Sequence, residues 1–483
     1  MRAAALWACL AIVACAGSRA RTSPPLTAAT RSRGLDYTFG LDAAFQLLSV
    51  RLCFEGDAPM TLVSGAPRSA DLLRDPRVVR EHGKLISRPL RRDGVRISLA
   101  GLAANSCIAY SVDVRAALEN DSLMLAYPGE HSLLVGSELF LWRPSRRPND
   151  LRVRARFELP EGIAVSTPWR EHDHDYELDE SAFAFSGHLV FGQFGRFELP
   201  VIGGVLDVIT MEGFEKRTLS AIAPWLASAA QMVSQPGGAF PIAHLQVIVV
   251  PTSPSIFPIH FGHTGRSGGG SIVLFTPTDM DADQFRADWI AVHEFSHLLH
   301  PFVQRGDAWL SEGLATYLQE VLRVRAGALP EADAWRRLFE GAKLGRDADD
   351  GLAEETRRMA HAGNYQRVYW AGAAIALMAD VEMRRRSEGR VSLDRVLAAL
   401  TRDRVGAMRG VSADELVRAI DERAGMDVFQ EIAARYLSAP NARLPDLSAL
   451  YRELGLLDDG DALAPPHAAP LAWVRAAIMA QSG

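Results

Sequence analysis

Two histidines, His293 and His297, lie four residues apart inside a long helical pattern. Residues 283–300 fit one amphipathic helix, which Pro301 ends. Within it, His293 and His297 are separated by about 40° around the helix axis and by about 6 Å along it. Both imidazoles can therefore reach one metal ion without straining the backbone. Glu294 lies beside the same face, where its carboxylate can contact a water molecule next to the metal.

A second helix supplies the ligand that this pair lacks. The segment 307–317 reads as the start of that helix and carries Glu312. A catalytic zinc site needs three protein ligands and one open position for water, so His293, His297 and Glu312 together predict one zinc ion. For the HExxH alone, the alternative is a solvated helix face with an intrahelical contact between a histidine and a glutamate. A site with a third histidine six residues after His297 is excluded, because that position is Val303.

The residues around these positions resemble a known group of peptidases. Residues 293–297 read HEFSH and residues 309–317 read WLSEGLATY, which is similar to the two motifs of the gluzincin peptidases of the aminopeptidase N family. The β-rich N-terminal half also resembles the related glycyl aminopeptidases. The specific resemblance covers residues 245–379. It implies a thermolysin-like catalytic domain with one zinc ion, in which Glu294 is the general base. The connection between the two motifs is shorter than is usual in that family, and loops tolerate such changes of length.

The resemblance also implies a strand that binds the substrate, but this sequence differs from the family's motif there. Members of the family carry a G-x-M-E-N segment on an edge strand, whose glutamate binds the free α-amine of the substrate. The corresponding residues here, 268–272, read GGGSI, and no glutamate occurs between residues 251 and 293. We expect Gly269, Gly270 and Ser271 to lie close to the substrate backbone. The other interpretation of the glycines is a hairpin tip. An endopeptidase, a differently anchored exopeptidase and an aminopeptidase that uses another acidic residue all stay open.

One tyrosine matches a further position of the family. Residues 369–372 read YWAG, at the place of the family's Y-E-K-G. The resemblance implies that the Tyr369 hydroxyl donates to the carbonyl oxygen on which negative charge develops. Tyr365, one helical turn earlier, is the reserve candidate. A packing role for a tyrosine near a helix start is the other interpretation.

The spacing of apolar residues changes along the chain and predicts three structured regions. Short runs with period two, bounded by Gly, Pro, Asn and Asp, predict an antiparallel, sandwich-like β domain over residues 21–212. Helical and strand patterns then alternate over residues 213–385, the expected thermolysin-like domain. Residues 386–483 are expected to form a helical C-terminal region. The predicted fold class is therefore multidomain, with a β domain, an α/β catalytic domain and a helical part.

The N-terminal residues resemble an export signal. Arg2 and the apolar run over residues 3–14 have the length of a signal peptide, so we exclude residues 1–20 from the fold. The run ends in IVAC, which resembles a bacterial lipobox; cleavage after residue 14 would leave Cys15 lipidated. The alternative is ordinary cleavage after Ala20. We expect an exported bacterial protein, either periplasmic or anchored to the membrane as a lipoprotein.

Two further cysteines follow in the predicted β domain. Cys53 and Cys107 form an even pair in an exported chain, which favours a disulfide. The alternative is two buried free thiols. Neither cysteine has a CxxC neighbour, which argues against a cysteine metal site.

The net charge of the chain bears on whether its partner is a nucleic acid or a protein. A net charge of -6 over 483 residues gives no electrostatic support for binding nucleic acid. We expect a zinc-dependent hydrolase of peptide bonds in the cell envelope that acts on a peptide or protein. The alternative function is an inactive binding or scaffold protein that keeps the peptidase fold. The sequence leaves the oligomeric state open.

Overall fold

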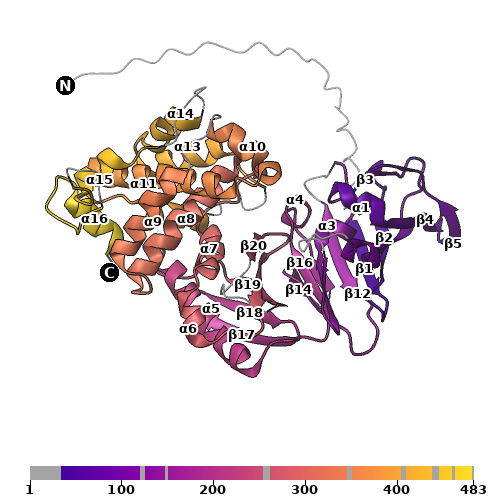
Figure 1. Ribbon diagram of the computed structural model, residues 1–483. Coiled ribbons are helices and arrows are strands. Elements are labelled where there is room, and N and C mark those ends of the chain that lie inside the picture. The colour runs from indigo at the N-terminus through magenta and orange to yellow at the C-terminus, as the bar shows by residue number, and fades with distance from the viewer. Residues whose placement is uncertain are drawn as a thin grey trace, which may run out of the picture.

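The computed structural model describes residues 34–119, 126–146, 151–173, 175–253, 261–344, 351–403, 409–437, 445–458 and 463–480. The predicted signal over residues 1–20 and the predicted lipidation site Cys15 lie outside these residues. In Figure 1 a β domain lies to the right and a helical part to the left, with a further sheet below and between them. The predicted fold class is confirmed in this arrangement of a β domain, an α/β unit and C-terminal helices.

The N-terminal domain is built from short strands and four short helices. Its strands are β1 (Gly34–Leu41), β2 (Leu47–Glu55), β3 (Thr61–Val63), β4 (Leu73–Glu81), β5 (Lys84–Pro89), β6 (Arg92–Asp93), β7 (Arg96–Ser98), β8 (Cys107–Asp113), β9 (Ala126–Pro128), β10 (Ser132–Gly136), β11 (Arg143–Pro144), β12 (Arg152–Phe157), β13 (Ala164–Ser166), β14 (Arg170–His172), β15 (Asp175–Glu177) and β16 (His188–Gly192). Its helices are α1 (Pro67–Leu72), α2 (Val114–Leu118), α3 (Ser137–Phe140) and α4 (Ser181–Ala184).

These strands form one large sheet and two small ones. The large sheet has the order β14-β15-β12-β1-β2-β8-β4-β5, and the small sheets have the orders β13-β16-β10-β9 and β11-β3-β7-β6. Leu48, Val50 and Leu52 are buried and alternate with exposed or half-buried neighbours in β2, as a strand with one face on a core requires. The pairing is antiparallel except between β1 and β12. Cys53 and Cys107 occupy paired positions on β2 and β8 and form a disulfide.

A five-stranded sheet follows the N-terminal domain. Its strands are β17 (Gly195–Val201), β18 (Gly204–Thr210), β19 (His244–Thr252), β20 (Phe261–Gly265) and β21 (Gly270–Pro277), in the order β17-β18-β19-β21-β20. β17 and β18 therefore belong to this sheet, although the sequence prediction assigned them to the N-terminal domain that was to end at residue 212. The three central strands are parallel, and β20 is an antiparallel edge strand.

Both faces of the five-stranded sheet are covered. In β19, Val247 and Val249 face a core made with helices, whereas Ile248 and Val250 face a smaller apolar cluster. That cluster includes Leu134 of β10 and Val190 of β16, so it joins the sheet to the N-terminal domain. Burial on both faces explains why β19 is a continuous apolar run rather than an alternating one.

The rest of the chain is helical. The helices are α5 (Lys216–Ser234), α6 (Ala282–Ala287), α7 (Ile290–Ser296), α8 (Ala308–Arg325), α9 (Glu331–Leu344), α10 (Leu352–Ala362), α11 (Tyr365–Ser387), α12 (Leu393–Arg402), α13 (Ala413–Ala424), α14 (Phe429–Leu437), α15 (Ser448–Leu454) and α16 (Ala472–Met479), with short 3₁₀ turns η1 (His297–Leu299) and η2 (Arg305–Asp307). One buried apolar cluster extends from Leu206 to Met479. The helices after Ser387 therefore share the core of the five-stranded sheet.

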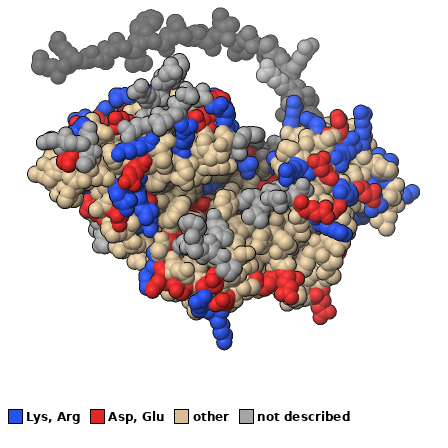
Figure 2. All heavy atoms as spheres, in the orientation of Figure 1, with Lys and Arg blue, Asp and Glu red and all other residues tan. Residues whose placement is uncertain are grey.

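Charged side chains do not gather by sign on the face shown in Figure 2. Lys and Arg side chains are interspersed there with Asp and Glu. Within the described ranges, no helix combines the length and the apolar character that crossing a membrane requires.

Candidate metal centre

The helix that carries the two histidines is shorter than the sequence suggested. The sequence predicts one helix over residues 283–300. In the structure this helix is interrupted after Ala287, and α7 begins at Ile290. The Asp288 carboxylate accepts the backbone N–H groups of Ile290 and Ala291 at 3.1 and 3.0 Å, and the indole N–H of Trp225 at 3.1 Å. An aspartate that caps backbone donors in this way starts a new helix. α7 therefore begins one turn before His293.

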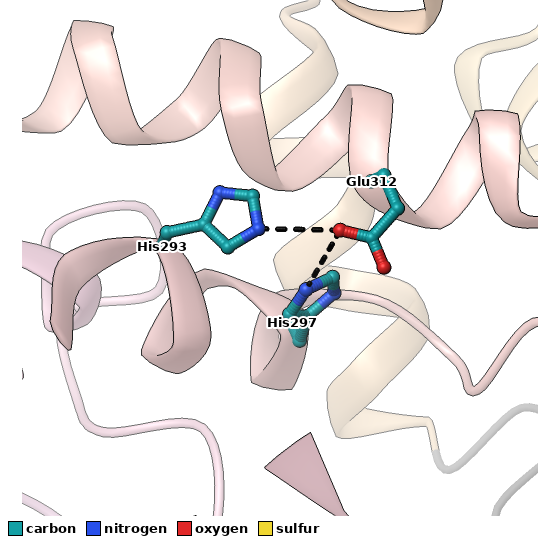
Figure 3. A group of neighbouring side chains, drawn as sticks. All are labelled: His293, His297 and Glu312. Atoms are coloured by element: carbon teal, nitrogen blue, oxygen red, sulfur yellow. Dashed lines mark hydrogen bonds and ion pairs between the residues drawn. The ribbon is translucent and has the colours of Figure 1, made fainter. Parts of the chain in front are cut away.

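His293, His297 and Glu312 converge from two helices. The imidazole Nε2 atoms of His293 and His297 lie 3.2 and 3.5 Å from Oε2 of Glu312. One ligand atom from each residue falls within 4.8 Å of the others, a spacing that can hold a metal ion. Figure 3 shows Glu312 projecting from α8 toward the two imidazoles, which project from the helix opposite it. Among the described residues, these three make up the one such group.

Hydrogen bonds behind the ligands fix their orientation. Nδ1 of His293 lies 2.9 Å from Oε1 of Gln319, and the Gln319 amide donates to Glu320 at 2.7 Å. Because the amide nitrogen of Gln319 is turned to Glu320, its oxygen faces His293 and accepts the Nδ1 proton. Nε2 of His293 is then left with its lone pair toward Glu312, the form that binds a metal. Ser311 lies 3.2 Å from Nδ1 of His297.

The charge of Glu312 also suits a metal ligand. Burial opposes its ionisation, but the neighbouring His297 and His293 lower the pKa of Glu312 below its usual value. His293 is buried, and His297 and Glu312 are partly exposed, as an open position for water requires. Two imidazoles and one carboxylate are a donor set that fits zinc.

Glu294 lies between this group and the edge of the five-stranded sheet. The hydroxyl of Thr264, on β20, lies 2.8 Å from a carboxylate oxygen of Glu294 and 2.8 Å from its backbone oxygen. Gly262 leaves room for the Glu294 side chain, since a Cβ there would lie 2.5 Å from its Cγ. Burial raises the pKa of Glu294. β20 thus holds the carboxylate that the sequence predicted as the general base.

Tyr369 also lies at the metal centre. Its ring stacks on that of His293, with centroids 5.9 Å apart and an angle of 9° between the planes. Burial, followed by the carboxylates of Glu312 and Glu294, raises the pKa of Tyr369. Its hydroxyl therefore stays protonated near those carboxylates and can donate. The reserve candidate Tyr365 contacts the Tyr369 ring from the solvent side, with centroids 6.4 Å apart.

The predicted substrate strand is wrong. Gly269 precedes β21, and Gly270 and Ser271 are its first two residues; β21 is an interior strand of the sheet and not its edge. Ser271 is buried, and its hydroxyl accepts a hydrogen bond from the side-chain amide of Gln246 at 2.9 Å. The edge strand next to the metal centre is β20, which pairs with β21 and whose Thr264 hydrogen-bonds to Glu294. The glycines could not reveal this, since the order of strands in a sheet is a long-range property.

Gly269 and Gly270 instead line a cavity apart from the metal centre. The cavity has a volume of about 1280 Å³ and lies where the N-terminal domain meets the five-stranded sheet. Its wall includes Arg266 and His300 but none of His293, His297 and Glu312. Arg266 donates to the backbone oxygens of His297 and His300, just after the C-terminal end of α7.

Three residues at the centre were missed in the sequence. Gln319 follows Glu312 by two helical turns, so the helical period could have placed it on the same face. Gly262 and Thr264 alternate on one face of β20, but a five-residue strand that contains two glycines reads as a turn.

No family model and no curated protein matches this sequence. Similarity appears among solved structures. An aminopeptidase N family protein from Idiomarina loihiensis superposes with a TM-score of 0.69 and 16% identity, over 87% of this chain and 78% of that one. The M1 zinc metallopeptidase of Deinococcus radiodurans gives 0.55 and 15%, over 86% and 94%. Yeast LTA4 hydrolase gives 0.55 and 11%, over 88% and 71%.

These neighbours agree with the resemblance carried by HEFSH and WLSEGLATY. Because the sequence identities are 16% or lower, the similarity to these solved structures concerns the fold. The chain runs from a β domain through an α/β unit to C-terminal helices, and the superposition on the Idiomarina protein covers 87% of it. The chain has the fold of the aminopeptidase N-like M1 zinc metallopeptidases, of the gluzincin type.

Proposed function

We propose that this chain is a zinc-dependent hydrolase of peptide bonds. The observation that carries the proposal is the convergence of His293, His297 and Glu312 within 4.8 Å, with Glu294 beside them. Two imidazoles and one carboxylate hold zinc in catalytic sites and leave a position open for water. A neighbour of the same fold, the Deinococcus M1 zinc metallopeptidase, has been solved as a mutant bound to a Tyr-Ser-Ala substrate, which supports a peptide as substrate here.

The residues divide the chemistry among themselves. When bound, zinc supplies a Lewis acid that polarises the scissile carbonyl and makes water more acidic. Glu294 accepts the proton of the attacking water and later delivers it to the leaving amine. Tyr369 donates its hydroxyl to the carbonyl oxygen as negative charge develops there. Thr264 holds the Glu294 carboxylate against β20 while the proton moves.

The sequence of the edge strand β20 bears on whether the enzyme cleaves only at a free N-terminus or also within a peptide. β20 reads FGHTG and offers no carboxylate for a free α-amine. We therefore expect peptides with a blocked N-terminus to be cleaved as well as free ones. An aminopeptidase with its amine anchor elsewhere would cleave only the free peptides, so paired N-acetylated and free substrates separate the two.

The site of action follows from the N-terminal sequence. We propose that the protein is exported and acts in the cell envelope, and the disulfide between Cys53 and Cys107 supports an oxidising compartment. Metabolic labelling with a radioactive fatty acid tests the anchor. Label on the wild type that disappears in Cys15→Ser supports a lipoprotein; an unlabelled mature chain that begins after Ala20 supports ordinary secretion.

Metal removal tests the proposed activity. The full-length mature protein is incubated with a peptide library before and after treatment with a chelator, and again after addition of zinc. We expect cleavage to disappear with the metal and to return with zinc. A protein that holds zinc but cleaves no member of a broad library would instead favour the inactive scaffold.

A further inference from the structure

One segment of the N-terminal domain has a large excess of positive charge. Residues 74–96, which run from β4 into β7, contain eight Lys and Arg residues against three Asp and Glu residues, although the whole chain has a net charge of -6. All eight basic side chains are exposed. Three of them form ion pairs with carboxylates. Within the described ranges the other five form none: Arg80, Lys84, Arg91, Arg92 and Arg96. The protein itself therefore leaves much of this charge without a partner.

The hairpin of β4 and β5 holds part of this charge out in solvent. Its two turn residues, His82 and Gly83, both have positive φ, of 51° and 74°. A two-residue turn of this kind follows the natural twist of two paired strands and makes a tight hairpin. β5 is the outermost strand of the large sheet, and five of its six residues are exposed. Leu85 is the most open of them, at 88%.

Each of these features has an ordinary explanation when it is taken alone. Charges on an exposed edge strand keep two copies of a protein from pairing edge to edge. A single exposed leucine needs no function. Neither explanation accounts for an excess of one sign and a large apolar side chain on the same projecting hairpin. Those two features together are what attaches a protein to the surface of an anionic membrane, through phosphate contacts and buried apolar area.

The hairpin lies at the end of the large sheet that is nearest in sequence to the N-terminus. One row of paired residues crosses the sheet from Arg80 through Cys107 and Cys53 to Asp36 of β1. Cys15, the predicted lipidation site, precedes Asp36 by 21 residues, and a chain of that length spans at most roughly 70 Å. A lipid on Cys15 would therefore keep this end of the sheet within that distance of a membrane.

The metal centre lies elsewhere in the molecule. In Figure 1, β4 and β5 form the right-hand extremity, whereas α7 and α8, which hold the metal centre, lie in the left half. Contact between the hairpin and a membrane therefore does not require the metal centre to approach that membrane.

We propose that the β4–β5 hairpin docks on an anionic phospholipid membrane, with Arg80 and Lys84 at the headgroup phosphates and Leu85 against the acyl chains. The proposal rests on the proposed location in the cell envelope and goes beyond the peptidase function. It does not require Cys15 to be lipidated, because the charged and apolar contacts come from the hairpin itself.

Vesicle binding tests the hairpin without a lipid anchor. The full mature chain that begins after Ala20 is sedimented with vesicles of phosphatidylglycerol and phosphatidylcholine in equal amounts, and with vesicles of phosphatidylcholine alone. At about 0.05 M salt we expect binding to the anionic vesicles only. At about 1 M salt that binding should disappear, because salt screens the charges of the hairpin from the phosphates.

Substitutions in the hairpin locate the contact. Arg80→Gln together with Lys84→Gln should weaken binding to the anionic vesicles roughly 30-fold, the effect of removing two basic side chains from such a surface. Leu85→Ser should weaken it roughly tenfold, through the loss of buried apolar area. Both substitutions are at exposed positions, so the fold should persist.

Arg418 and Arg423 provide the matched control. Both are exposed on α13, and neither forms an ion pair within the part of the chain that the structure describes. Arg418→Gln together with Arg423→Gln changes the net charge by the same amount as the hairpin pair does. Binding to the anionic vesicles should equal that of the wild type.

Four results would each overturn the proposal. They are no binding to the anionic vesicles, equal binding to the neutral ones, wild-type binding in the hairpin variants, and the same loss in the α13 variant. Tighter binding to an oligonucleotide than to the vesicles, at equal phosphate concentration, would also overturn it, because the surface would then belong to a nucleic acid.

The outcome separates the docking surface from the proposed function. If the wild type cleaves the peptide library but does not bind anionic vesicles, the peptidase function stands and the docking surface is wrong. If the hairpin binds the vesicles but the zinc-loaded wild type cleaves nothing, the surface stands and the peptidase function fails. Vesicle binding by a protein that cells retain in the cytoplasm would support the surface and contradict the proposed export.

Discussion

Gly313 and Gly372 lie in backbone contact where α8 crosses α11. A Cβ on Gly313 would collide with the backbone of Gly372, and a Cβ on Gly372 would collide with the carbonyl oxygen of Trp309. Gly313 directly follows Glu312, and Gly372 follows Tyr369 by three residues. The close approach of these two glycines therefore brings a metal ligand on one helix and the proposed hydroxyl donor on another to the same centre.

The first prediction concerns this helix crossing. Gly372→Ala should lower the free energy of unfolding by about 1–3 kcal/mol, because the added methyl group must push two backbones apart. The same shift should weaken zinc binding, since Glu312 moves with α8. Denaturant unfolding and a zinc competition assay measure the two effects.

Gly306 serves as the control for this substitution. A Cβ there would meet no heavy atom within 4 Å. Gly306→Ala should therefore be neutral or stabilise by up to about 1 kcal/mol, through the entropy of the unfolded chain. If Gly372→Ala were as stable as Gly306→Ala and bound zinc normally, the crossing would not be what positions the centre.

The second prediction concerns the residue behind His293. Gln319→Leu removes the acceptor of the Nδ1 proton and leaves the Glu320 carboxylate without its amide donor. We expect zinc affinity to fall about 10–100-fold. Competition with a chromogenic chelator gives the dissociation constants.

Gln304→Leu is the matched control, because Gln304 is exposed on the loop before η2 and does not contact a ligand. Its zinc affinity should equal that of the wild type. An unchanged affinity in Gln319→Leu would show that the hydrogen bond does not hold the ligand.

The metal ligands could be predicted from the sequence because their relationship is local. His293 and His297 are one turn apart, so the helical period alone places them on one face. Glu312 lies near the start of the next helix, and the need of a catalytic zinc site for a third protein ligand singled it out. The helix break was missed because the apolar pattern continues through Asp288, and only a contact with Trp225 and two N–H groups shows that this aspartate caps α7.

The sheet could not be predicted in the same way. β18 precedes α5 in the sequence and β19 follows it, and the two strands pair. The change from a strand pattern to a helical pattern near Gly213 therefore does not coincide with the start of the sheet. The edge position of β20 likewise depends on its pairing with β21. The sequence alone therefore points to Gly269 as the residue at the edge strand, whereas the structure has Thr264 and Gly262 there.

The third prediction concerns the disulfide of the N-terminal domain. Cys53 and Cys107 are 54 residues apart, and closing a loop of that length stabilises by about 4 kcal/mol in the chain-entropy model. The double substitution of both cysteines with serine should lower the free energy of unfolding by about 2–4 kcal/mol, as should reduction of the wild type. Zinc affinity should not change, since both cysteines lie in the N-terminal domain. A double variant as stable as the oxidised wild type would contradict this.

If His293, His297 and Glu312 hold the zinc ion and Glu294 is the general base, removing the carboxylate of Glu294 should abolish cleavage but leave the metal bound. Zinc content and peptide-library cleavage are compared in the wild type and in Glu294→Gln. We expect one zinc ion per chain in both proteins and cleavage by the wild type alone, with turnover lowered at least about 100-fold in the variant. Cleavage by Glu294→Gln at the wild-type rate, or a cleaving wild type that holds no zinc, would contradict this assignment.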